Sequence, residues 1–191
     1  LLRSRLETGK VADPALYLAY LRAGSSGAEE YTVRFDASFP LLKHTDSDTF
    51  ILSRYLAGLY AVRQGDWDFA LSSLTRFSEL AGDRFPDYVS WSAWYRAYSR
   101  YRLGEFDRSA AEFAAFLDAW KLHPWSWQAA MTGALAALQS GGDPLPFTEQ
   151  ALKYAPNGAS YAESVILRSS ILVDRKDYEG AEKILKGIAD G

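Results

Sequence analysis

The chain has 191 residues, a formal net charge of −3 and a hydrophobic content of 48%. This length fits one globular domain or a short repeat array, and the 6 Trp, 12 Tyr and 10 Phe argue against disorder because such side chains must be packed. Acidic and basic residues are interleaved, so there is no basic field for nucleic acid and no polybasic membrane patch. No apolar run approaches the roughly 20 residues that cross a bilayer. The absence of cysteine excludes disulfides, thiol catalysis and Cys-ligated metals.

Residues 1–46 form the less regular part of the sequence. Asp13-Pro14 precedes an apolar stretch and predicts a helix with proline in its first turn. The apolar rhythm over residues 29–42 alternates like a strand as much as it follows a helical period, and we favour helix or irregular packing there. We therefore expect residues 1–46 to be an N-terminal helical cap or a degenerate first hairpin.

From residue 47 onward the sequence predicts one helix after another. Apolar residues recur at steps of three and four, and glycines and prolines separate the segments. The expected N-caps or first helical residues are Asp48, Asp68, Asp87, Asp107, Trp125, Phe147, Ala159 and Tyr178. The predicted fold is therefore all-α, with residues 47–191 forming four helical hairpins over approximately residues 49–84, 87–122, 125–156 and 159–191.

Three short stretches repeat one pattern. Residues 65–70, 104–109 and 176–181 each contain a turn residue, an acid, an aromatic, an acidic position and then a small residue. The aromatics Trp67, Phe106 and Tyr178 lie 39 and then 72 residues apart, and 72 is twice 36. A period in the middle thirties indicates stacked helical hairpins, which individually cannot bury their apolar faces, and so predicts an α-solenoid.

This pattern resembles the tetratricopeptide repeat (TPR) family over most of the chain. In that family a small residue lets the two helices of a repeat approach closely, an aromatic follows the turn, and a second small residue lies where the helices cross. The matching residues are Gly58, Gly65, Trp67, Ala70, Leu74 and Phe77 in the first repeat, Ala97, Gly104, Phe106, Ser109, Phe113 and Phe116 in the second, and Ser169, Tyr178, Ala181, Leu185 and Ile188 in the last.

The sequence departs from the family pattern at three places. Lys176 replaces the turn glycine of the last repeat. Pro144 and Pro146 fall at the start of the third repeat's second helix, which is therefore expected to begin late. Arg96 and Arg100 stand where the family usually has Leu and an aromatic, so either the register is shifted by one residue or their stems are buried and their charged heads reach solvent.

A narrower resemblance bears on localisation. The long linkers and the sequence Phe113-x-x-Phe116-Leu117 are similar to the bacterial cell-envelope branch of the family, which includes lipoproteins. This resemblance implies a periplasmic or envelope location, with a cytoplasmic location as the alternative. The chain opens with Leu1 rather than Met, so a preceding segment is not excluded.

No constellation of residues indicates catalysis. The two histidines, His44 and His123, lie about 80 residues apart in expected loops, without further ligands at metal-binding spacing. Asp46-x-Asp48 resembles half of a calcium loop but lacks the following Gly and the distal Glu, so helix capping is the better explanation. There is no Gly-x-Ser-x-Gly elbow and no phosphate-binding loop. We therefore expect a non-enzyme without cofactor or metal.

The most unusual predicted surface is an aromatic stripe on one helix, with Trp91, Trp94, Tyr98 and Tyr101 at steps of three, four and three. The TPR resemblance implies that five positions of each first helix line a concave groove. By that rule the partner-binding groove comprises Tyr55, Leu59, Val62, Arg63, Trp91, Trp94, Tyr98, Tyr101, Arg102, Met131, Leu135 and Gln139. The stripe could bind an external ligand, as aromatics and Arg often do at hot spots, or pack against residues 1–46. The Trp120, Trp125 and Trp127 cluster is interpreted as core between repeats.

These observations favour a non-catalytic scaffold that binds a peptide or partner subunit through its groove, where Arg63 and Arg102 could hold carboxylates. One alternative is a structural or assembly subunit of a bacterial envelope or transporter complex, which self-associates. The last helix has an apolar side that a second copy or further residues could cover. Another alternative is a small-ligand-binding protein. The partner's identity is not predicted.

Overall fold

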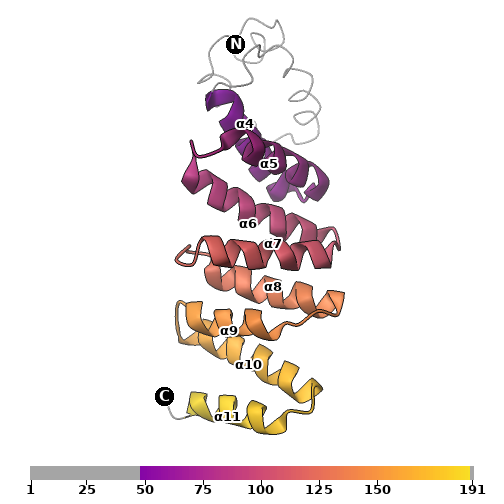
Figure 1. The fold of residues 1–191 in the computed structure, drawn as a ribbon, viewed down its shortest axis with the longest axis vertical. Coiled ribbons are helices and arrows are strands. Elements are labelled where there is room, and N and C mark those ends of the chain that lie inside the picture. The colour runs from indigo at the N-terminus through magenta and orange to yellow at the C-terminus, as the bar shows by residue number, and fades with distance from the viewer. Residues whose placement is uncertain (1–47, 190–191) are drawn as a thin grey trace, which may run out of the picture. The chain divides into compact units, whose positions relative to one another are not determined.

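The computed structural model describes residues 48–189, and every regular element among them is a helix (Figure 1). The elements are α4 (Asp48–Gln64), α5 (Trp67–Ala81), α6 (Pro86–Arg102), α7 (Phe106–Ala119), α8 (Ser126–Ser140), α9 (Leu145–Tyr154), α10 (Gly158–Asp174) and α11 (Tyr178–Ala189). The all-α prediction is confirmed for this part of the chain. The predicted cap at residues 1–46, together with His44, lies outside the described residues.

The described residues divide by their internal contacts into two compact units, residues 48–99 and residues 100–189, with the boundary inside α6. In the first unit α4 packs against α5, and α6 follows them along the chain (Figure 1). In the second unit α7 packs on α8, α8 on α9, α9 on α10 and α10 on α11. Helices that are neighbours in sequence are thus neighbours in space within each unit.

Two helix starts differ from the prediction by two residues. Asp66, not Asp68, caps α5, since its carboxylate accepts a hydrogen bond from the Phe69 amide at 3.2 Å. The α9 helix does not begin late at Phe147 but at Leu145, because Pro146 lies in its first turn, where the missing N–H would have no helical partner. Asp143 supports this start by accepting a hydrogen bond from the Leu145 amide at 3.1 Å.

Turns of one type join the two helices of each hairpin, at four places in the chain. Gly65, Gly104, Gly141 and Lys176 all have left-handed backbone conformations, with φ of 77°, 78°, 76° and 64°. At each turn the amide of this residue donates to a carbonyl three residues back, and the next amide donates to one five residues back. These paired bonds satisfy the last carbonyls of α4, α6, α8 and α10. Lys176 therefore occupies the glycine position of the other three turns, at a steric cost that glycine avoids.

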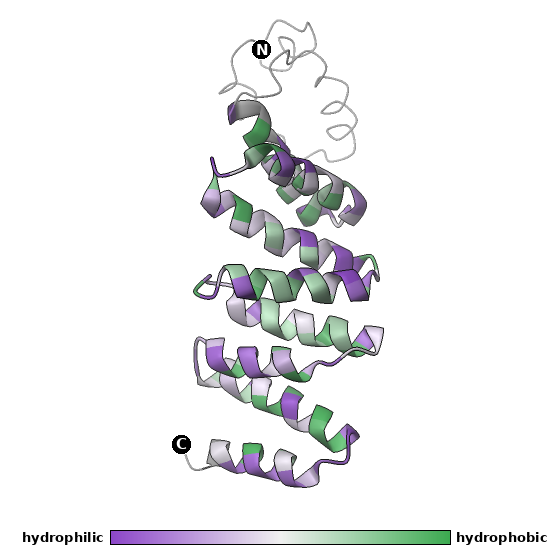
Figure 2. Ribbon diagram, in the orientation of Figure 1, coloured by the Kyte–Doolittle hydropathy of each residue, from purple (hydrophilic) through white to green (hydrophobic). Residues whose placement is uncertain are grey.

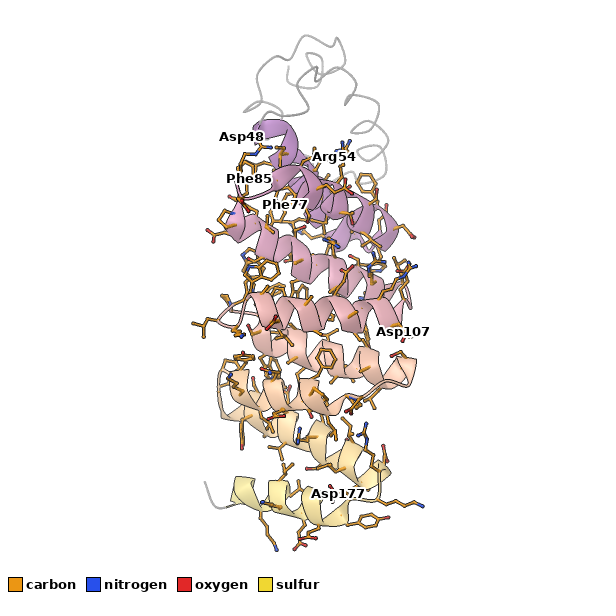
Figure 3. The ribbon with its side chains drawn as sticks, in the orientation of Figure 1. Asp48, Arg54, Phe77, Phe85, Asp107 and Asp177 are labelled. Carbon is orange, nitrogen blue, oxygen red and sulfur yellow. The ribbon has the colours of Figure 1, made fainter. Side chains whose placement is uncertain are left out.

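The core of the first unit lies between α4, α5 and the start of α6. Ile51, Leu74 and Phe77 are fully buried, and Figure 3 shows Phe77 with Phe85, whose ring centroid lies 6.5 Å away. Gly58 on α4 packs directly on Leu74, so a Cβ there would overlap the leucine side chain. The absence of a side chain at Gly58 therefore sets how closely α4 and α5 approach.

The second unit has its own core. Phe113 and Phe116 on α7 are fully buried, as are several alanines of α8. Gly133 on α8 lets Phe147 of α9 approach, since an added Cβ would lie 2.5 Å from that ring. Each ring buried in this way contributes about 1.5–3 kcal/mol through removal of apolar surface from water.

Arg100 is satisfied by acidic partners rather than extended into solvent. Its guanidinium donates to Glu112 on α7 at 2.7 Å and bonds Glu105 in the intervening turn. These carboxylates raise the pKa of Arg100 against the opposing effect of burial. Ala97, at the expected small position one turn earlier, is fully buried.

Candidate interaction face

The aromatic rings predicted for the groove are largely packed within the first unit. Tyr55 and Trp94 are only 6% and 8% exposed. The Tyr55 ring contacts Phe77 at 5.2 Å, and burial is the main cause that raises its pKa above the ordinary value of 10.0. The Trp94 ring stacks on Tyr98, with centroids 5.1 Å apart and planes 17° apart. These rings therefore present little area to an external partner.

Four further groove residues of the first unit are less buried. Leu59, Val62 and Trp91 are half-buried and pack against the first unit's core. Arg63 is exposed in the last turn of α4. The first unit thus provides a cation and the edges of apolar side chains, rather than an open row of aromatic rings.

The end of α6 contributes Tyr101 and Arg102 to the second unit. The Tyr101 ring lies edge-on to Phe106, with centroids 5.6 Å apart, which holds it against the start of α7. Arg102 is exposed and makes a contact within the protein.

Of the three groove residues predicted on α8, Met131 lies beside α10. Trp127 donates from its indole nitrogen to the Ser164 hydroxyl at 2.9 Å, which joins the two helices. The same hydroxyl lies 3.8 Å from the Met131 sulfur. Leu135, one turn further along α8, is 39% exposed, and Gln139 is also exposed. The bond from Trp127 to α10 also fits the interpretation of this tryptophan as core between helix pairs.

The groove predicted from the sequence does not include three aliphatic residues that the structure shows to be exposed. Leu138 on α8 and Ile166 and Val173 on α10 are 41%, 61% and 45% exposed. Met131 and Leu138 lie ten and three residues before the turn residue Gly141, and Ile166 and Val173 lie ten and three residues before the turn residue Lys176, so these four residues occupy equivalent positions. We define the α8/α10 face as Met131, Leu135, Leu138, Ile166 and Val173. Figure 2 shows α8 mostly in green and white.

Four residues of the α8/α10 face are exposed although α10 has other apolar residues that form its buried side. α10 buries a separate side, which includes Val165 and Leu172, against the rest of the second unit. A surface helix normally places polar residues opposite its buried stripe. Single exposed aliphatics are common, whereas contiguous apolar patches mark binding sites, and the four exposed aliphatics here lie on two helices that the Trp127–Ser164 hydrogen bond joins.

A hollow lies between α7 and α9, with a volume of about 510 Å³. It is lined by Ala114, Leu117, Asp118, Lys121, Asp143, Pro146, Phe147, Gln150, Lys153 and Tyr154. Its charged groups are mostly paired: Asp118 with Lys121 at 3.7 Å, and Asp143 with Arg175 at 2.7 Å. The Leu145 amide, and secondarily Arg175, lower the pKa of Asp143. The residues that line this hollow include two acids and two lysines, so their charges balance.

The described residues contain no group of three or more His, Asp or Glu placed to hold a metal ion. His123 packs its ring edge-on to Phe116, and its Nδ1 accepts the Trp125 amide hydrogen bond at 3.1 Å. Burial lowers its pKa. It therefore acts as a packed loop residue in this environment.

None of the described helices is both long enough and apolar enough to cross a membrane. Comparison of the chain with models of protein families, with curated proteins and with solved structures found no match.

Proposed function

We propose that this chain is a non-catalytic interaction scaffold, a TPR-like α-solenoid that binds a peptide or a partner subunit through the α8/α10 face. The observation that carries the proposal is the exposure of Leu135, Leu138, Ile166 and Val173 on two helices that contact each other. The proposal that the helices form a repeat is supported by the four equivalent left-handed turns, spaced 35–39 residues apart along the chain.

The alternatives each have one supporting observation. Tyr178 and Leu185 are exposed on α11, which favours self-association through the last described helix. The 510 Å³ hollow between α7 and α9 favours a small ligand. We rank both below the scaffold, because the exposed apolar residues described on α11 lie on one helix whereas the α8/α10 face draws on two, and because the charges around the hollow are mostly paired. An envelope or periplasmic setting remains part of the proposal and derives from the sequence resemblance alone.

The test is selection of a displayed random peptide library on the full chain, followed by binding measurements on the double variant Ile166→Ser, Val173→Ser. Serine has a helix propensity close to that of isoleucine and valine, so α10 should persist. We expect selected peptides to bind the double variant about 10-fold more weakly, equivalent to about 1.4 kcal/mol.

The matched control is Leu122→Ser, Leu185→Ser, which removes the same number of exposed aliphatic residues away from the face. Peptides that bind wild type and the Ile166/Val173 variant equally would refute the proposal. Light scattering of the control variant addresses self-association, because loss of an oligomer on removal of Leu185 would favour the assembly alternative.

A further inference from the structure

The exposed charges of α8 and α10 are acidic. The α8 sequence, SWQAAMTGALAALQS, contains no ionisable side chain. On α10 the ionisable residues are Glu163, Arg168 and the terminal Asp174. These two helices therefore carry one arginine and two acids.

The arginine is turned away from the face. Arg168 donates to the Leu145 carbonyl oxygen and to the Thr148 hydroxyl, both at 3.0 Å, so its head is held against α9. Arg175, at the end of α10, is likewise held by Asp143 at 2.7 Å. Both cations at this part of α10 are engaged by the α9 side of the second unit.

The two acids stay on the exposed side of α10. Glu163 and Asp174 are exposed, and neither forms an ion pair with another residue in the described range 48–189. They lie before and after Ile166 and Val173, and the positions 163, 166, 170 and 173 follow steps of three, four and three. Such steps place side chains on one stripe of a helix. Asp174 lies eleven residues after Glu163, about three helical turns, and so falls on the same stripe. The stripe therefore has an acid at each end and, between them, Ile166 and Val173 on either side of Ser170.

The dimensions of this stripe suit another helix. At a rise of about 1.5 Å per residue, Glu163 and Asp174 are separated by about 16 Å along the axis, and Ile166 and Val173 by about 10 Å. The spacing of seven residues between the two aliphatics equals one heptad, which is the repeat of helix-on-helix packing. An amphipathic helix could lay its apolar stripe on the face and its flanking cations near both acids.

Resting on the proposed function, we infer that the partner is an amphipathic helical segment with Lys or Arg flanking an aliphatic stripe. Apolar burial supplies most of the affinity, while the exposed acids select the sign of the partner's charge and speed its association. Exposed ion pairs are individually weak and screened by salt, so the preference should diminish at high ionic strength.

The experiment uses two synthetic peptides of about five helical turns, roughly 18 residues each. Both carry the same leucine stripe; one has Lys at its flanking positions and the other has Glu. Binding to the full chain is followed by fluorescence anisotropy at low and high salt. We expect the Lys peptide to bind at least about 10-fold more tightly at low salt.

Charge reversal at the face provides the decisive variant. Glu163→Lys, Asp174→Lys should reverse the preference toward the Glu peptide. The matched control, Glu149→Lys, Glu179→Lys, makes the same change in net charge on exposed positions of α9 and α11 and should leave the preference intact. Helical circular dichroism of each variant checks that the fold is retained.

The outcomes separate the two proposals. If both peptides bind equally and both are lost in Ile166→Ser, Val173→Ser, the interaction face stands and the inferred charge preference is wrong. If the control weakens the Lys peptide as much as the face variant does, the attraction is general and the inference is again overturned. If neither peptide binds at concentrations up to roughly 1 mM, both the inference and the proposed face are rejected.

Discussion

At the scale of single residues, the burial of His123 should make the free energy of unfolding depend on pH. Its ring lies against Phe116, and desolvation lowers its pKa below the ordinary value of 6.5. A histidine with a lower pKa in the folded state binds fewer protons than in the unfolded chain. The free energy of unfolding should therefore be highest above pH 6.5 and fall as the pH decreases through the folded-state pKa of His123.

The variant His123→Asn removes this titration while an amide oxygen can still accept the Trp125 hydrogen bond. We expect the loss of stability between about pH 7.5 and about pH 5 to be smaller in the variant than in wild type. Urea denaturation at both pH values measures the difference. Since His44 is present in both proteins, its contribution cancels; identical pH profiles would show that burial of His123 is not coupled to protonation.

At the scale of single residues, the burial of side chains accounts for part of what the sequence could not predict. The spacing of Trp94 and Tyr98 correctly placed them on one side of α6, and their rings stack. Spacing does not reveal whether that side is covered. The burial of Trp94 and Tyr55 depends on neighbours contributed by other helices, so exposure of the aromatic stripe could not be inferred from its period.

At the scale of elements, the turn between α10 and α11 contains an avoidable strain. Lys176 has a φ of 64°, a conformation that costs a residue with a Cβ roughly 1–2 kcal/mol. Lys176→Gly removes this cost, offset by the larger entropy of glycine in the unfolded chain. We expect a net gain of about 0.5–1 kcal/mol in the free energy of unfolding, measured by urea denaturation.

The reciprocal control is Gly104→Ala. Gly104 has nearly the same conformation, and an added Cβ would meet no atom within 4 Å, so only the backbone is tested. We expect this variant to lose about 1 kcal/mol. Changes of the same sign in both variants would mean that the turn conformation does not determine the effect.

Most of the element boundaries followed from local rules. Turn glycines and apolar steps predicted all eight described helices, since both signals are local properties of the chain. The errors arose where two residues could serve equally well. Asp66 and Asp68 are both good caps, and a proline at Pro146 can either delay a helix or lie in its first turn; only the backbone path decides between these.

At the scale of the whole molecule, two units with separate cores should respond separately to core damage. Phe77 is buried in the first unit and Phe113 in the second. We expect Phe77→Leu to accelerate amide exchange by about 10-fold in residues 48–99 and less in the second unit. Phe113→Leu should give the opposite distribution. Hydrogen exchange read by mass spectrometry measures both.

Equal acceleration throughout residues 48–189 in both variants would instead indicate one cooperative unit.

The exposed residues of α10 illustrate the limit of sequence reasoning at this scale. Ile166 and Val173 have the same spacing as core residues of a surface helix, so their sequence alone does not distinguish a buried stripe from an exposed one. Only the packing of α10, which turns Val165 and Leu172 inward, distinguishes them.

The position of Met131 has a practical consequence. It is the single methionine of the chain, and it lies next to Ser164 at the junction of α8 and α10. Carbon-13 enrichment of methionine methyl groups would therefore yield one NMR resonance, originating from the α8/α10 face. Titration of a candidate partner could be followed at that nucleus in the unaltered polypeptide, without a dye or an introduced tag.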